Sequence, residues 1–256
     1  MFFDSHAHYD DERFNEDRAS VLRQMKDAKV DWILNAGADV ASSQRSVQLT
    51  QDYDFIYASV GVHPHDTGEM DEKEIRSLED LAGNDKVVAI GEIGLDYYYD
   101  HSPREIQKYW FRRQMQLAKR LRLPVIIHNR DAHADTMEII TSEDISSLGG
   151  VLHCFSGSWE MAKRLIEMGV YISFAGPVTF KNAIKSVEVV KNMPMDKILI
   201  ETDSPYLTPV PYRGKRNDST YIKYIAEHIA NIRGITVEEV AERTMDNTKR
   251  LFKIED

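Results

Sequence analysis

The sequence has 256 residues, of which 42% are hydrophobic and 29% are charged. That length suits one large domain or two small ones and can bury a substantial core without disulfide bonds. The formal net charge of −10 argues against a protein that holds nucleic acid through a broad basic face, although a small site that grips a strand end stays open.

The cysteine content and the N-terminus indicate a cytoplasmic protein. Cys154 is the only cysteine, which excludes an internal disulfide and fits a reducing compartment. The N-terminus has neither a basic segment nor an apolar one, so we expect no signal peptide. No apolar run approaches the roughly 20 residues that span a bilayer, so we expect no membrane partner. The oligomeric state stays open, with a monomer favoured.

Short apolar segments alternate with amphipathic ones along the chain. We expect strands at residues 2–10, 30–37, 87–96, 124–130, 150–155, 171–176 and 198–203, and a strand that opens into a loop at 56–65. We expect helices at 17–28, 41–51, 71–82, 103–121, 132–140, 159–168, 182–191, 219–232 and 236–252. The last helix should begin with Thr236 as its cap and Glu239 at the third helical position.

This alternation predicts the fold class. Strands that alternate with helices form βαβ units and a parallel sheet. Eight such units in this length close most naturally into a TIM (β/α)₈ barrel, here a single domain over residues 1–256 with an extra C-terminal helix. A doubly wound open sheet is the alternative, but no G-x-G-x-x-G follows the first strand.

Two histidines on the first strand suggest a metal site. Side chains alternate along a strand, so His6 and His8 point to the same side and bring two imidazoles into one small volume. Neutral imidazoles are good ligands for divalent cations such as Zn²⁺. Taken alone, this pair is hardly better explained as a metal site than as two ordinary surface histidines.

Further polar residues lie late in other apolar strands, where a barrel has its active site. Burying a polar side chain without a partner costs several kcal/mol of folding free energy, and a cation shared by several such side chains would remove that penalty. They are His63 at the end of the third strand, Glu92 in the fourth, His128 ending the fifth, His153 late in the sixth and Asp203 ending the eighth. All of them lie near the carboxyl ends of their strands, so a shared site explains their positions better than coincidence does.

The ligand types indicate a site with two divalent cations, Mg²⁺, Mn²⁺ or Zn²⁺. Two-metal sites suit displacement at phosphorus and need a carboxylate that bridges the ions, for which Glu92 is the natural candidate. We assign His6, His8 and Asp203 to one ion, and His128 and His153 to the other. Asp203 can also accept a proton from a metal-bound water and so act as the general base.

The sequence resembles the TatD family of metal-dependent deoxyribonucleases. Seven motifs carry the resemblance across essentially the whole chain: FFDSHAHYD, GVHPH, GEIGLDYYYD, HNRD, HCFSG, ETDSPYL and RGKRN. The resemblance implies an amidohydrolase-type barrel, divalent-metal-dependent hydrolysis and 3′→5′ exonuclease activity on DNA. It also implies metal ligation by His6, His8, Glu92, His128, His153 and Asp203. One departure is visible, because Ser219 follows Asp218 where the family usually has proline.

Several other residues are candidates for contact with substrate. His63 could face the substrate, or it could satisfy backbone groups around Pro64. Arg130, Arg213 and Arg216 could meet phosphates, a task that suits the planar guanidinium group, although surface arginines are common. The tyrosines at 97–99 either stack on bases or simply pack at the barrel rim. Asp96 and Glu201 are expected to orient ligands rather than bind metal.

Other functions remain open on the same barrel. One alternative is a metal-dependent amide or ester hydrolase with a substrate other than nucleic acid. Related barrels often use a carboxylated lysine as the bridge, whereas the strand at 87–96 supplies Glu92 and no lysine. A metal-dependent binding protein without turnover is disfavoured because every expected ligand is present.

Overall fold

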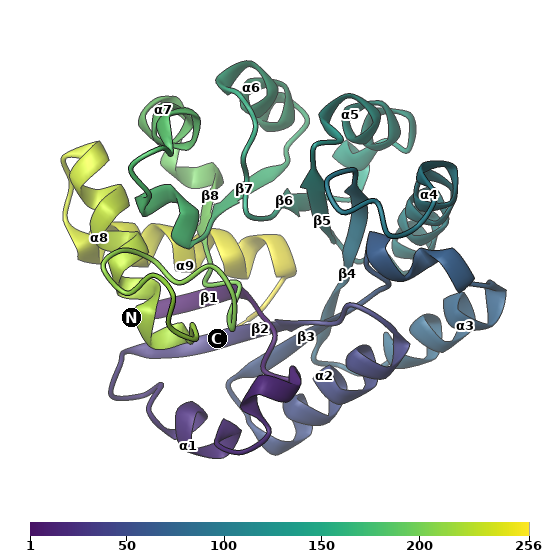
Figure 1. Cartoon of the computed structure of the whole chain (residues 1–256), viewed down its shortest axis with the longest axis horizontal. Coiled ribbons are helices and arrows are strands. Elements are labelled where there is room, and N and C mark those ends of the chain that lie inside the picture. Colours follow the sequence, from purple (N-terminus) through teal and green to yellow (C-terminus); the bar gives the residue numbers. More distant parts are fainter. Residues whose placement is uncertain (256) are drawn as a thin grey trace. The chain divides into compact units, whose positions relative to one another are not determined.

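A computed structural model describes residues 1–255, so Asp256, the last residue of the expected domain, lies outside it. Within these residues eight parallel strands follow one another in sequence order from β1 to β8, with helices between them (Figure 1). The fold is the expected (β/α)₈ barrel, and α9 is its extra C-terminal helix.

Contacts divide the described chain into two compact units. One unit comprises residues 1–35, 154–167 and 171–255, and the other comprises 36–153 and 168–170. The expectation of a single domain over 1–256 stays a prediction. None of the helices in residues 1–255 has the length and apolar character needed to cross a membrane.

The first unit holds the strands at the two ends of the chain. Strand β1 pairs with β2, β7 pairs with β8, and an isolated bridge joins Ala7 to Ser204. The elements are β1 Phe2–Ala7, α1 Arg18–Arg23, β2 Val30–Ala36, α6 Trp159–Glu167, β7 Tyr171–Phe174, α7 Ile184–Asn192, β8 Ile198–Ile200, α8 Ile222–Arg233 and α9 Val237–Phe252. Helix α9 packs on β1 and β8, and Thr236 caps it by accepting a hydrogen bond from the Glu239 amide, as expected.

The second unit holds the middle strands, with β4 between β3 and β5, and β6 beside β5. Its elements are α2 Val40–Asp52, β3 Ile56–Val60, α3 Glu72–Leu81, β4 Val87–Asp96, α4 Arg104–Leu121, β5 Val125–Arg130, α5 His133–Ser142 and β6 Gly150–Leu152. All ten residues of β4 are buried. A Cβ at Gly94, where φ is +145°, would lie 2.0 Å from the carbonyl oxygen of His128, so β4 approaches β5 too closely for any other residue.

Several of the expected strands are too long, including the first, because β1 ends at Ala7 and His8 lies beyond it. Strand β3 ends before His63, β6 ends just before His153, and β8 ends before Asp203, so these residues lie in the loops that follow. His63 instead caps a short 3₁₀ helix over Pro64–Glu69. In the loop after β8, the backbone amide of Thr202 donates to the Asp4 carboxylate at 2.8 Å, which takes it out of the strand ladder.

A candidate metal centre

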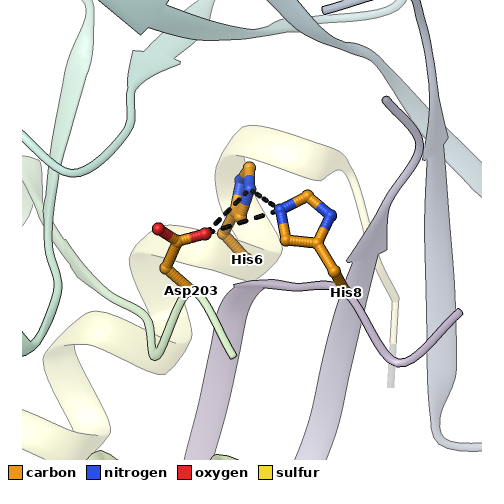
Figure 2. A group of neighbouring side chains, drawn as sticks. All are labelled: His6, His8 and Asp203. Atoms are coloured by element: carbon orange, nitrogen blue, oxygen red, sulfur yellow. Dashed lines mark hydrogen bonds and ion pairs between the residues drawn. The ribbon is translucent and has the colours of Figure 1, made fainter. Parts of the chain in front are cut away.

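The first cluster of ligand atoms comprises His6, His8 and Asp203 (Figure 2). The two Nε2 atoms lie 3.1 Å apart, and the Oδ1 atom of Asp203 lies 3.4 Å from Nε2 of His8 and 3.8 Å from Nε2 of His6. His6 is buried in β1, and His8 follows the end of that strand. The structure therefore brings together the three residues that the sequence assigned to one ion.

Backbone hydrogen bonds hold this cluster in place. The amide of Asp203 donates to the carbonyl oxygen of His6 at 2.9 Å, and the amide of His8 donates to the carbonyl oxygen of Ser204 at 2.7 Å. Asp203 has a φ of +55°, a left-handed conformation that aspartate adopts more readily than most residues. These bonds orient the side chains before any ligand arrives.

A buried polar network supports β1 next to this cluster. Asp4 accepts hydrogen bonds from the Thr202 amide and, at 2.6 Å, from the hydroxyl of Ser219. The Ser219 amide in turn donates to the hydroxyl of Tyr9 at 2.8 Å. Burial raises the pKa of Asp4 to about 7, although the hydrogen bonds from Ser219 and Thr202 lower it. The serine that replaces the usual proline therefore supplies two hydrogen-bonding groups that proline lacks.

The second cluster is centred on the buried carboxylate of Glu92 in β4. Its Oε1 atom lies 2.7 Å from Nδ1 of His128, 2.7 Å from Nε2 of His153 and 3.5 Å from Nε2 of His63. The amide of Glu92 donates to the carbonyl oxygen of Gly37, and the amide of His153 donates to that of Ile127. His63 thus joins the expected ligands Glu92, His128 and His153.

The electrostatics of the second cluster favour a charged glutamate among imidazoles. Burial alone would raise the pKa of Glu92, but His153, His63 and His128 hold that pKa well below its usual value. Burial, together with the neighbouring His128, lowers the pKa of His63 well below 6.5. Burial would also lower the pKa of His128, but hydrogen bonds with Asp96 and Glu92 raise it instead.

Asp96, at the end of β4, connects this cluster to the loop that follows. Its Oδ2 atom lies 3.1 Å from Nε2 of His128 and 3.0 Å from Nε2 of His65. Its Oδ1 atom accepts hydrogen bonds from the amides of Tyr98 and Tyr99, at 3.0 and 2.8 Å. Asp96 therefore orients His128 as expected, with Nδ1 of that ring turned to Glu92. From the sequence, His65 is most simply a residue that satisfies backbone groups around Pro64, and that interpretation misses its contact with Asp96.

The donor sets fit divalent cations. Ligand atoms of His6, His8 and Asp203 all lie within 4.8 Å of one another, and so do those of His63, Glu92 and His128. Each set combines imidazole nitrogen with carboxylate oxygen, a combination suited to Zn²⁺ or Mn²⁺. The expected bridging role of Glu92 between two ions stays a prediction.

The three arginines proposed to contact substrate differ in their surroundings. Arg130 lies over the ring of Tyr98, and Arg213 lies over the ring of Phe180 at 4.1 Å. Arg216 is bound to the Asp17 carboxylate at 2.6 Å and donates to a backbone carbonyl oxygen, so its guanidinium already has partners within the fold. Glu201, expected to orient a ligand, accepts hydrogen bonds from the Cys154 amide and the Ser173 hydroxyl.

A (β/α)₈ barrel with clusters of histidine and carboxylate side chains at and just beyond its strand ends is the architecture of a metal-dependent hydrolase. Residues 3–253 match the profile of the family described as TatD related DNase, and the chain belongs to this family.

Relatives and solved structures agree with this membership. The chain is 49% identical over 254 residues to the Bacillus subtilis protein named uncharacterized metal-dependent hydrolase YabD, covering 99% of this chain and all of that one. It is 34% identical over 258 residues to the 3′-5′ ssDNA/RNA exonuclease TatD of Shigella flexneri, covering 98% and 99% of the two chains. The crystal structure of YjjV, a TatD homologue of Escherichia coli, superposes with a TM-score of 0.93 at 30% identity over 99% and 98%.

Proposed function

We propose that this hydrolase cleaves phosphodiester bonds of nucleic acid, removing nucleotides of DNA from the 3′ end with the help of divalent cations. The observation that carries the proposal is the pair of imidazole–carboxylate clusters, each built from three or more ligand atoms. Support for the substrate comes from the Shigella flexneri relative, whose name states 3′-5′ exonuclease activity on single-stranded DNA and RNA.

Each cluster is proposed to hold one divalent cation, Mg²⁺, Mn²⁺ or Zn²⁺. His6, His8 and Asp203 would hold the first, and Glu92, His128 and His153 the second, with His63 beside them. Bound there, the cations would supply a water of lowered pKa and offset negative charge on the phosphoryl oxygens.

The side chains have separate tasks in this proposal. The Asp203 carboxylate would accept the proton of the attacking water, and the backbone bond to His6 fixes the position of this residue. Asp96 keeps the ring of His128 in one orientation, so that Nδ1 faces Glu92. The three neighbouring histidines lower the pKa of Glu92 despite its burial, so its carboxylate stays ionised and able to bind a cation.

The direct test uses the full-length protein and single-stranded oligonucleotides labelled at either end. With Mn²⁺ or Mg²⁺ we expect a ladder of products shortened from the 3′ end, blocked by a phosphorothioate at the last linkage and abolished by a chelator. A parallel RNA series measures the preference between the two sugars. Turnover of ester or amide substrates alone, with every oligonucleotide left intact, would contradict the proposal and favour the alternative hydrolase.

The proposal also places the enzyme in the cytoplasm as a monomer, with nucleic acid as its partner. The cytoplasmic location is supported by the single cysteine, which fits a reducing compartment. Size-exclusion chromatography with light scattering checks the monomer, since a stable dimer would double the measured mass.

A further inference from the structure

The loop after β4 exposes a group of aromatic side chains beside the second cluster. Tyr98 and Tyr99 are 59% and 51% exposed, although large aromatic rings usually bury most of their surface. Their rings lie 4.9 Å apart and nearly perpendicular, and the ring of Tyr99 stacks on His101 at 5.5 Å. The Cζ atom of Arg130 lies 3.9 Å from the ring centroid of Tyr98. We call Tyr98, Tyr99, His101 and Arg130 the aromatic platform.

Tyr97 shows what a packed tyrosine looks like in the same loop. Its hydroxyl donates to Asp135 at 2.6 Å, Arg104 lies over its ring at 4.3 Å, and the side chain is half-buried. The sequence left two explanations for these tyrosines, packing at the barrel rim and stacking on bases. Packing describes Tyr97, but it does not explain the exposed rings of Tyr98 and Tyr99.

Hydrogen bonds of the backbone hold the residues of the platform in place. The amide of Tyr97 donates to the carbonyl oxygen of Arg130 at 2.9 Å, and the amides of Tyr98 and Tyr99 both donate to Asp96. Asp96 and Arg130 lie opposite each other in the register of the parallel strands β4 and β5. A surface fixed in this way loses little conformational entropy when a ligand binds.

Contacts connect the platform to the second cluster. The ring of Tyr99 meets the edge of His65 at 5.3 Å, and Nε2 of His65 lies 3.0 Å from Asp96. The same Asp96 oxygen lies 3.1 Å from His128, which contacts Glu92. A ligand that lies on the platform is therefore next to the residues proposed to hold a cation.

We propose that the aromatic platform stacks the unpaired bases of a single-stranded nucleic acid whose backbone enters the Glu92 cluster. This inference rests on the proposed function and specifies its substrate, because bases in a duplex are already stacked and cannot lie on the tyrosine rings. Stacking needs no particular base, and Arg130 adds a positive charge for the backbone. It also explains how a chain with a net charge of −10 can hold a polyanion without a broad basic face.

Binding measurements with and without bases test the platform. The Asp203→Asn protein, loaded with Mn²⁺, is titrated with labelled oligothymidylate and with an abasic oligomer of the same length. We expect the base-containing strand to bind more tightly. Tyr98→Ala and Tyr99→Ala should each weaken its binding about 5- to 150-fold, with a smaller effect on the abasic strand. Tyr99→Phe should restore binding.

Tyr109→Ala is the matched control, because Tyr109 is also 51% exposed but lies on α4. Equal affinity for the two strands, or losses at Tyr98 and Tyr99 no larger than at Tyr109, would overturn the platform even if the wild-type protein shortens DNA. Base-dependent binding without any cleavage would overturn the proposed function and leave the platform standing. A protein that binds no oligonucleotide at all would overturn both.

Discussion

The backbone amide of Asp203 donates a 2.9 Å hydrogen bond to the carbonyl oxygen of His6. This bond joins residues from opposite ends of the sequence, and it does not involve either side chain. The position of the Asp203 carboxylate beside the two imidazoles is therefore set by the backbone. A substitution of the carboxylate alone should change the chemistry of the cluster and leave its geometry in place.

Replacing Asp203 by asparagine tests this expectation. Asn has the same shape but cannot accept the proton of an attacking water, so kcat on a DNA oligonucleotide should fall by about 10² to 10⁴. The Glu92 cluster should still bind a cation, measured by elemental analysis of the purified variant. Asp196→Asn, at an exposed position, is the control and should behave as wild type. Near wild-type turnover in Asp203→Asn would remove Asp203 from the mechanism.

Metal affinity at the Glu92 cluster should depend on pH through His128. Hydrogen bonds with Asp96 and Glu92 raise the pKa of His128 above 6.5, and the protonated ring cannot bind a cation. As the pH falls below that raised pKa, affinity for Mn²⁺ should decrease about tenfold for each pH unit. Calorimetric titrations over a range from about pH 5 to about pH 8 measure this slope.

The Asp96→Asn variant tests whether Asp96 is responsible for the raised pKa of His128. The variant removes the negative partner that raises the pKa of His128, so the loss of affinity should begin at a lower pH than in wild type. An unchanged onset in the variant would show that Asp96 does not control the protonation of His128.

The buried Asp4 predicts a pH-dependent stability in metal-free protein. Its pKa is about 7 in the fold, against 3.8 for an accessible aspartate, so the folded state retains a proton that the unfolded state has lost. The free energy of unfolding should therefore decrease as the pH rises from about 4 to about 7, by up to about 4 kcal/mol, and level off above that.

Asp4→Asn keeps the shape of the protonated acid and cannot ionise, so its stability should lack this decrease. Urea unfolding with a chelator present, repeated across the pH range, gives the difference between the two proteins. The comparison with the variant is needed because the lowered pKa of His63 makes the stability of both proteins increase with pH, which is opposite to the effect of Asp4. Parallel stability curves for wild type and variant would contradict the assignment to Asp4.

Two glycines with positive φ allow a test of the packing of β4. A Cβ at Gly94 would lie 2.0 Å from the His128 carbonyl oxygen, whereas nothing lies within 4 Å of a Cβ at Gly169. Gly169→Ala should cost about 1 kcal/mol, from its backbone conformation alone. Gly94→Ala should cost about 3 kcal/mol or more, because β4 and β5 must separate. Thermal denaturation of the two variants decides the comparison, and equal losses would contradict the close approach.

The alternation of apolar and amphipathic segments was enough to predict the fold class, because each βαβ unit carries its own signal. The grouping of these side chains was also predictable in part, with His6, His8 and Asp203 in one cluster and His128 and His153 in the other. Glu92 was expected to bridge the two groups, and the structure places it beside His128 and His153. Strand ends were not predictable, since β8 stops where the Thr202 amide turns to Asp4, a partner far away in the sequence.

Contacts between side chains that are distant in the sequence were not predictable either. Nothing near Arg216 in the sequence indicates that its guanidinium binds Asp17. His65 looks like an ordinary loop residue beside Pro64 until the fold brings it to Asp96. His63 was expected at a strand end facing substrate. The chain leaves β3 at Val60 and forms a 3₁₀ helix, so His63 lies beyond the strand and beside Glu92, and its contact with substrate stays a prediction.

The two oxygens of Asp96 contact different parts of the second unit: one holds the amides of Tyr98 and Tyr99, and the other holds His65 and His128. One carboxylate would thus participate in both proposed binding equilibria, those of the cation and of the strand, and thermodynamic reciprocity requires any coupling between them to be equal in both directions. If a cation near His128 strengthens the grip on a strand by some factor, the strand strengthens retention of that cation by the same factor. Such an enzyme would lose its metal least readily while substrate is bound, and would scan nucleic acid only weakly when starved of metal.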